Sequence, residues 1–287
     1  MILYLLLSVL FTSYLVIAFK VFHRFRVNTF HAIVVNYVVC VITGSAFKGG
    51  VPDYAGYVQS EWVWYAVLLG CSFVTLFNIM GYVTQRDGIT VVSVATKLSM
   101  VIPICASFYL YGESATWVKI VGIALSFAAV YLTSQRDENH GVAKSASLLL
   151  PMVLFLGSGM NDTLVKHAQH LYLDNETFGD FLIMCFSMAA AAGLVALAYD
   201  VIWMKRTFGA RALVAGVVLG VPNYFSIYFL LKALEHGDAS FIYPVNNIGI
   251  VGFSAVVAWL FFKEHLSVKN WLGLGLAVAA IVLMSAG

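Results

Sequence analysis

Long apolar runs, separated by short polar or glycine-bearing breaks, follow one another along the whole chain. A helix that crosses the hydrocarbon core of a bilayer needs about 20 mostly apolar residues. Ten runs approach this length, and they cover residues 2–20, 30–47, 62–84, 90–111, 117–134, 147–168, 178–200, 211–234, 239–262 and 270–286. The pattern therefore predicts an all-α, polytopic membrane protein with ten transmembrane helices. Because no break is long enough for a soluble domain, we expect residues 1–287 to form a single transmembrane domain.

The amino-acid composition excludes most other classes of protein. Hydrophobic residues make up 61% of the chain and charged residues 10%, whereas soluble domains average about 45–50% and about 25%. A soluble protein with so few polar side chains could not cover its apolar surface. Disorder, and nucleic-acid binding as the main activity, are excluded by the same imbalance. We expect two partners, a lipid bilayer (the plasma or inner membrane) and a small-molecule solute, and no nucleic acid.

The second half of the chain resembles the first at an offset that drifts from 146 to 151 residues. Three pairs of segments carry the similarity: Lys20 with Lys166, 86–88 with 235–237, and 112–116 with 263–267. Residues 1–134 are then a first five-helix repeat, and residues 147–286 are a second. Because five is odd, the second repeat is inverted relative to the first. Inverted repeats are typical of secondary transporters, whose substrate site lies near the bilayer midplane.

A short motif precedes the last, glycine-bearing helix of each half. It reads Gly112-Glu113-Ser114-Ala115-Thr116 in the first half and Lys263-Glu264-His265-Leu266-Ser267 in the second. Together with the ten spans and the two repeats, this motif resembles the EamA-type branch of the drug/metabolite transporter superfamily over essentially the whole chain. The resemblance implies an alternating-access carrier with a central cavity, lined by helices from the middle of each half. It identifies a superfamily rather than a substrate.

The two halves differ in the positions of their prolines. Pro103 lies ten residues before Glu113, where the family often has proline, but the equivalent position before Glu264 is Ser254. The second half carries Pro244 instead, so we expect its helix to unwind at a different point.

The basic residues and the resemblance give opposite orientations. Loops and adjoining span ends on one side of the predicted membrane carry 11 Lys and Arg residues, and the other side carries 4. The positive-inside rule places the more basic side in the cytoplasm and both termini outside. The resemblance implies that both termini are inside, and the two orientations stay open.

Lys97 lies about eight residues into its apolar run, where a charge is unfavourable unless it is paired or hydrated. Helical spacing puts Ser93 and Met100 on the same face as Lys97. In the repeat, the place of Lys97 is taken by Asn246, which is followed by Asn247. We predict that Lys97 binds an anionic or carboxylate-bearing solute and that the two asparagines form hydrogen bonds with it. The alternatives are a lysine that snorkels to the interface or a structural ion pair.

Asp162 lies in the middle of its run, four residues before Lys166. It is the candidate for proton coupling. The alternatives are an ion pair with Lys97 or Lys166, or recognition of an ammonium group on the substrate.

The remaining predicted solute-binding residues are polar side chains within other apolar runs. They are Tyr243, Asn78, Asn161 and Asn223. Pro222 precedes Asn223, and a proline frees backbone carbonyls, which persist in a membrane mainly where they line protein or a wet cavity. The alternative for each polar residue is a hydrogen bond that only holds the helix bundle together.

The sequence gives no sign of catalytic, metal or cofactor chemistry. The four cysteines lie within apolar runs and form no CxxC pair, and no Walker A motif is present. The seven histidines are assigned to loops or interfaces. We therefore predict no enzyme, no cofactor and no metal site, but a secondary active transporter that moves a small polar metabolite of the amino acid or organic anion type, with proton coupling as an option. The alternative is an intramembrane enzyme or a flippase that acts on a lipid-linked substrate.

Overall fold

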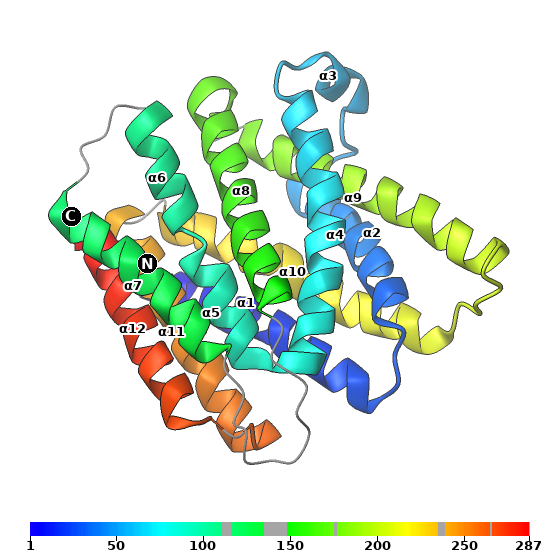
Figure 1. Cartoon of the computed structure of the whole chain (residues 1–287). Helices are drawn as coiled ribbons and strands as arrows, with labels where there is room; N and C mark the ends of the chain where they lie inside the picture. The colour runs from blue at the N-terminus through cyan, green and yellow to red at the C-terminus, as the bar shows by residue number, and fades with distance from the viewer. Residues whose placement is uncertain (111–115, 135–147, 175–176, 235–238, 265, 287) are drawn as a thin grey trace. The chain divides into compact units, whose positions relative to one another are not determined.

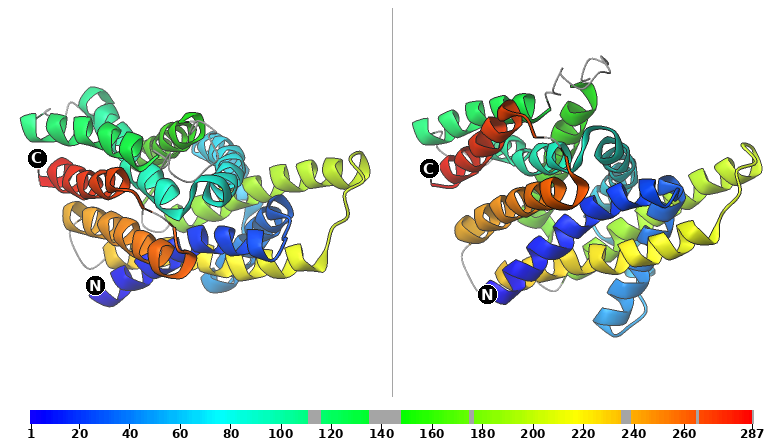
Figure 2. Two further views of the ribbon diagram at one scale, coloured as in Figure 1. Left: turned by 60° about the horizontal axis from the view of Figure 1, so that its bottom comes forward. Right: turned by 90° about the horizontal axis from the view of Figure 1, so that it is seen from below.

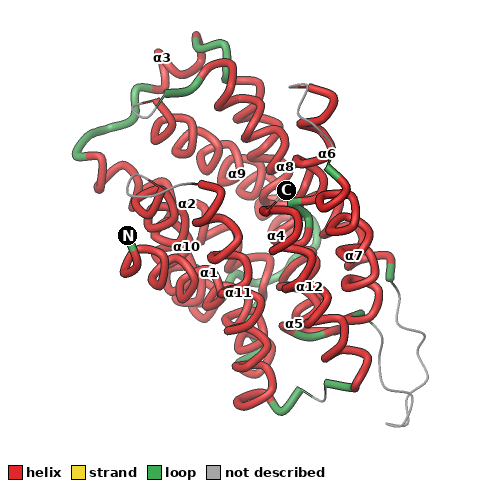
Figure 3. Tube along the Cα trace, turned by 90° about the vertical axis from the view of Figure 1, so that its left-hand side faces the viewer, coloured by secondary structure: helices red, strands yellow, loops and turns green. Residues whose placement is uncertain are grey.

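The structure is a computed structural model that describes residues 1–110, 116–134, 148–174, 177–234, 239–264 and 266–286. Every regular element within these ranges is a helix (Figure 3). Eight of the described helical segments are long and apolar enough to cross a membrane, and α7 is a shorter apolar helix of 17 residues. The prediction of an all-α protein with many apolar spans is therefore confirmed.

Contacts between residues divide the chain into two compact units. Unit 1 consists of Met1–Lys20, Tyr82–Met160 and Ser226–Gly287, and unit 2 consists of Val21–Gly81 and Asn161–Phe225. Four helices contribute to both units: α1 (Ile2–Arg24), α4 (Val63–Asp87), α8 (Leu149–Tyr172) and α10 (Ala210–Leu234). Each unit takes residues from both halves of the sequence, so this division is not that of the two predicted repeats, which remain a prediction.

Five of the described helices lie wholly within unit 1. They are α5 (Ile89–Leu98), α6 (Val101–Leu110), α7 (Trp117–Thr133), α11 (Ala239–Phe262) and α12 (Val268–Ala286). Helix α12 packs against α7 on one side and α11 on the other, as both views of Figure 2 show. Helix α5 packs against α11 and α7.

Two glycines set the close packing of α7 on α12. A Cβ atom on Gly122 would lie 3.0 Å from the backbone N of Met284, and one on Gly273 would lie 2.8 Å from the backbone N of Thr133. Small residues of this kind let helix backbones approach closely in membranes. The beginning of α7 lies against the end of α12, and the end of α7 lies against the beginning of α12. The two helices are therefore antiparallel.

Contacts along α11 fix the directions of two further helices. A Cβ on Gly249 would lie 2.8 Å from Val9, and Glu264, just beyond the end of α11, contacts Lys20. The order of these contacts makes α1 and α11 parallel. The carboxylate of Glu264 also binds the first residue of α5, so α5 runs antiparallel to α11.

Unit 2 is built around α2 (Thr29–Lys48), α9 (Thr177–Ile202) and the short α3 (Tyr54–Gln59). Polar contacts join α2 and α9 at both ends, a hydrogen bond between His31 and Asp200 and an ion pair between Lys48 and Asp180, so the two helices are antiparallel. Gly216 of α10 lies against Val35 of α2, and Gly220 lies against Val39. Residue numbers therefore increase in the same direction along both helices, so α10 is parallel to α2. An apolar cluster supports this unit, with Tyr57, Trp62, Ala66, Leu69, Ala168, Phe181, Met184 and Cys185.

Helix α3 falls in a stretch that the pattern of apolar runs left as a loop. The Asp53 side chain accepts a hydrogen bond from the backbone N of Gly56 at 3.1 Å and so caps the helix N-terminus. A helix of six residues is too short to give an apolar run of its own, and only the capping aspartate could have indicated it.

The predicted span at residues 90–111 is interrupted at Ser99–Met100, between α5 and α6. Pro103 lacks an N–H and cannot bond to the carbonyl of Ser99 four residues earlier. The N–H of Ile102 instead donates to that carbonyl at 2.9 Å, a tighter turn of the 3₁₀ type. Helices α10 and α11 continue through Pro222 and Pro244, so the unwinding that we expected at Pro244 is not found.

Candidate functional site

The interruption between α5 and α6 lies next to Lys97 and beside α11. The side-chain Nδ2 of Asn247 on α11 donates to the Sδ of Met100 at 3.5 Å. At the other end of α5, Glu264 binds the backbone N of Ile89. These two interactions mark the two ends of the line of contact between α5 and α11, which we call the α5–α11 seam.

Lys97 is half-buried in the last turn of α5, two residues before the interruption. Met100, three residues after Lys97, lies in the interruption and contacts Asn247. The structure therefore brings the interruption that follows Lys97 against the segment of α11 that carries Asn246 and Asn247. Broken helices that place charged and amide groups beside unwound backbone are the recurring way in which transporters bind solutes.

Asn246 is buried, with 3% of its surface exposed, and its Oδ1 has no hydrogen-bond partner among the described residues. A buried polar atom without a partner is rare in proteins. Tyr243, one turn earlier on α11, is 41% exposed. The two predicted site residues thus differ sharply in exposure.

A close approach of α8 holds the interruption from another side. A Cβ on Gly159 would lie 2.6 Å from the backbone O of Ser99 and 2.4 Å from the side chain of Ile102. Only glycine fits at this position, so the backbone between α5 and α6 packs directly against α8.

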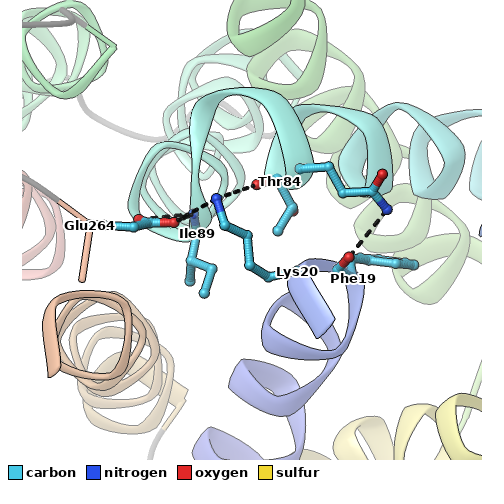
Figure 4. A network of polar contacts seen from close by, with 6 residues as sticks. Phe19, Lys20, Thr84, Ile89 and Glu264 are labelled. Atoms are coloured by element: carbon cyan, nitrogen blue, oxygen red, sulfur yellow. Dashed lines mark hydrogen bonds and ion pairs between the residues drawn. The ribbon is translucent and has the colours of Figure 1, made fainter. Parts of the chain in front are cut away.

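Glu264 anchors the beginning of α5 through a network of polar contacts (Figure 4). Its Oε1 and Oε2 accept hydrogen bonds from the backbone N of Ile89 at 3.0 and 3.2 Å. The Nζ of Lys20 lies 3.1 Å from Oε1 and donates to the carbonyl of Thr84 at 3.4 Å. A carboxylate at a helix N-terminus satisfies free N–H groups and the helix dipole. Gly88, with φ of 109°, leaves room for it, since a Cβ there would lie 2.8 Å from Oε2.

The position of Glu264 explains one part of the sequence motif. The backbone N of Glu264 bonds to the carbonyl of Ala258 at 3.0 Å, and Lys263 has φ of 51°. This is a Schellman-type helix end, in which the residue in the left-handed region is usually glycine. The counterpart of Lys263 in the first half of the sequence is Gly112, which lies outside the described residues together with Glu113.

In unit 2, Asn223 on α10 contacts Asn36 on α2. The Nδ2 of Asn223 donates to the Oδ1 of Asn36 at 3.2 Å, and the Nδ2 of Asn36 is buried without a partner in the described chain. The Sγ of Cys40 donates to the carbonyl of Gly220 at 3.4 Å. These residues form a polar cluster that joins two helices, and the sequence predicted only Asn223 as a site residue.

Three other predicted residues lie in unit 2. Asn78 is half-buried, and its Nδ2 donates to the carbonyl of Val74 in its own helix at 2.7 Å. Asn161 is 8% exposed. Asp162, near the middle of α8, is exposed, although most residues of α8 are apolar.

His31, which the sequence assigned to a loop or interface, lies in the first turn of α2, and its polar partner was not predicted. The His31 side chain is fully buried, and its Nε2 lies 2.9 Å from Oδ2 of Asp200, while Arg206 lies 3.3 Å from Oδ1. The ring stacks on Phe208 with centroids 5.6 Å apart. The sequence concealed this pair because its members are 169 residues apart. The Asn28 side chain, which caps α2, was the available local signal for the beginning of the helix that carries His31.

At the opposite end of the α2–α9 pair, Asp180 binds Lys48 and accepts a hydrogen bond from Tyr57 of α3. Burial and this hydrogen bond to Asp180 raise the pKa of the Tyr57 phenol. Tyr54 bonds to Ser187 at 3.0 Å and fastens α3 to α9 as well. These contacts hold α3 over the beginning of α9.

Comparison with known proteins defines the class and then the family. A helical membrane protein with a broken span, a lysine within that span and a buried asparagine on a neighbouring helix has the features of a solute carrier. The sequence model of the EamA-like transporter family matches residues 1–135 and 146–286. The chain belongs to the EamA-like transporter family, and it is a multi-pass integral membrane protein of the drug/metabolite transporter superfamily.

Two relatives and one solved structure resemble the chain. An uncharacterized protein of Haemophilus influenzae is 28% identical over 87% of this chain and 86% of its own length. The uncharacterized membrane protein YvaE of Bacillus subtilis is 35% identical over 29% of this chain and 69% of its own. A crystal structure matches with a TM-score of 0.61 at 15% identity, and it covers 98% of this chain and 94% of that one. At that identity the likeness concerns the fold alone.

Proposed function

We propose that this membrane transporter is a secondary active carrier. It moves a small polar metabolite, of the amino acid or organic anion type, by alternating access between two inverted five-helix repeats. The observation that carries the proposal is the interruption at Ser99–Met100, which places the end of α5, with Lys97, beside Asn247 of α11. Membership of a transporter family favours a carrier over an intramembrane enzyme.

The packing of α7 on α12 supports the two inverted repeats. Gly122 contacts Met284, and Gly273 contacts Thr133. The offset of 151 residues that relates the two sequence motifs also relates Gly122 to Gly273 and Thr133 to Met284. The repeat therefore relates the contact of Gly122 with Met284 to the contact of Gly273 with Thr133, as expected for two copies related by a twofold axis. The family match also falls in two stretches.

The helix directions support a count of ten alternating spans. Odd-numbered spans should be parallel to one another and antiparallel to even-numbered ones. Helices α1 and α11 are spans 1 and 9 and are parallel; α2 and α10 are spans 2 and 8 and are parallel. Helices α7 and α12, spans 5 and 10, are antiparallel. Each pair has the direction that the count requires.

In this proposal Lys97, Asn246 and Asn247 bind the solute, because they lie at the α5–α11 seam. The other solute-binding residues that we propose are Tyr243, Asn78, Asn161 and Asn223. Asp162 is the proposed proton-coupling residue. Its exposure supports this role, since a charged side chain near the middle of a membrane helix is expected to face protein or a wet cavity rather than lipid.

The experiment that tests the function is a flux assay with the purified protein in proteoliposomes. A panel of amino acids and organic acids is offered with and without a pH gradient. The proposal requires uptake or counterflow of at least one soluble metabolite without chemical change. Transfer of a fluorescent lipid between leaflets, with no flux of any soluble solute, would identify a flippase, and a new chemical product would identify an enzyme.

A further inference from the structure

Serine and threonine hydroxyls inside the helices of this protein usually bond to a carbonyl of their own helix. Thr96 bonds to Val92 at 2.8 Å, Ser126 to Ile123 at 2.7 Å, and Ser45 to Val41 at 2.7 Å. This bond is available to any helical serine, because it needs only a rotation of the side chain. It removes the penalty of burying a hydroxyl.

Ser93 and Ser254 depart from this behaviour. Ser93 is 1% exposed and Ser254 is fully buried, and neither hydroxyl has a hydrogen-bond partner within the described ranges. The other two hydroxyls with this property, among the described residues, are those of Ser13 and Thr90. Ser93 lies one turn before Lys97 on α5, and Ser254 lies on α11, which packs against α5.

Both serines lie on the α5–α11 seam. Ser93 follows Ile89 by four residues within α5, and Ser254 follows Asn247 by seven within α11, spacings that keep each pair on one helix face. Ile89 binds Glu264 at one end of the seam, Met100 contacts Asn247 at the other, and α5 packs against α11 between them. Both serines lie between these two contacts.

The seam offers hydrogen-bond donors and positive charge. Lys97 lies one turn beyond Ser93, on the same face, and among the described residues the Asn247 amide donates to a thioether, which is a weak acceptor. Neither 93–100 nor 246–254 contains an aspartate or a glutamate. Glu264, at the end of the seam, is engaged by Lys20 and the N-terminus of α5. A group that suits this lining accepts several hydrogen bonds and carries negative charge, as a carboxylate does.

We propose that the hydroxyls of Ser93 and Ser254 bind the carboxylate of the transported solute and select carboxylates over their neutral analogues. The Lys97 ammonium supplies the balancing charge. This inference rests on the proposed function, since it names the chemical class of the solute that the same carrier moves. It adds two residues to the solute site that the sequence alone did not assign.

Matched pairs of solutes test the inference in proteoliposomes that contain the whole chain. The pairs are succinate and succinamide, alanine and alaninamide, and phenylacetate and phenylacetamide, with putrescine as a cation. We expect the wild type to prefer the carboxylate of the pair that it transports. Ser93→Ala and Ser254→Ala should each weaken the apparent affinity for that carboxylate about tenfold, the effect of one hydrogen bond to a charged group, and should reduce the preference over the amide.

Two controls separate this loss from misfolding. Ser126→Ala removes a hydroxyl that is equally buried but bonds to its own helix, so both affinity and preference should stay at the wild-type value. Ser93→Thr keeps the hydroxyl and should retain most of the preference. Size-exclusion profiles check that every variant is folded.

The outcomes distinguish this inference from the proposed function. Transport of only putrescine or of the amides, or an unchanged carboxylate preference in both alanine variants, would overturn the carboxylate site and leave the carrier in place. An absence of flux for every soluble solute would overturn the carrier, and the inference with it.

Discussion

The ammonium of Lys20 lies 3.1 Å from the Oε1 of Glu264, and the same carboxylate caps the first residue of α5. A side chain beyond the end of α11 therefore holds the beginning of the helix that carries Lys97. Because α5 has only ten residues, its free N-terminal N–H groups are a large share of its backbone donors, and this carboxylate satisfies the one at Ile89.

We expect Glu264→Ala to lower the free energy of unfolding by about 1–2 kcal/mol, since it removes both the cap and the partner of Lys20. Glu264→Gln should lose less, because its amide oxygen still accepts from Ile89. Thermal unfolding in detergent measures the difference, with Glu61→Gln, an exposed residue, as the control. Equal melting temperatures for the wild type and Glu264→Ala would contradict the anchoring role.

The buried pair of His31 and Asp200 should be more sensitive to substitution than any exposed histidine. His31→Ala leaves Asp200 with Arg206 and removes the ring that stacks on Phe208. We expect a loss of about 1–3 kcal/mol, the usual effect of removing one partner of a buried polar pair. The control is His23→Ala, which alters an exposed side chain and should leave the melting temperature unchanged. A similar, small effect of the two substitutions would show that the pair contributes nothing.

The two glycines of the last helix give opposite predictions. In Gly273→Ala the new Cβ would lie 2.8 Å from the backbone N of Thr133, so α7 and α12 must separate, with a loss of about 1–3 kcal/mol. A Cβ on Gly275 meets nothing within 4 Å. Gly275→Ala should therefore be neutral or stabilising by up to about 1 kcal/mol, because alanine favours a helix. Melting temperatures that fall equally for both variants would contradict the packing of α7 on α12.

Asn36 and Asn223 should be energetically coupled across α2 and α10. A double-mutant cycle with Asn36→Ala and Asn223→Ala is expected to give about 0.6 kcal/mol, typical of a hydrogen bond between membrane helices. A second cycle with Asn36→Ala and Asn78→Ala is the reference, since Asn78 bonds to its own helix. The account requires coupling in the first cycle and additivity in the second.

The sequence predicted the helices well because membrane spans depend on hydropathy, which each residue carries with it. Each of the ten apolar runs overlaps a helix of the structure. The interruption after Lys97 was not predicted at Ser99, although its physical cause, Pro103, is visible in the sequence. A proline alone does not predict an interruption, because Pro222 and Pro244 lie within continuous helices.

Polar partners were harder to predict than helices. Lys97 and Asp162 stood out because charge is rare in apolar runs, but the partners of a polar group depend on helix packing. The pairing of His31 with Asp200 and the docking of Glu264 on α5 join residues 169 and 175 positions apart. The unpartnered hydroxyls of Ser93 and Ser254 were equally invisible, because serine is common in membrane helices and only the packing reveals which serine lacks a bond to its own helix.

The central claim is that Lys97 binds the solute of a carrier, and the most direct test is the initial rate of flux through Lys97→Ala in proteoliposomes. Lys269→Ala, at an exposed position of α12, is the control. We predict that Lys97→Ala reduces flux of the transported solute at least about tenfold, as expected when a charged binding group is removed, while the amount of folded protein stays the same. The Lys269→Ala protein should transport at the wild-type rate. Wild-type flux through Lys97→Ala would contradict the claim and remove Lys97 from the solute site.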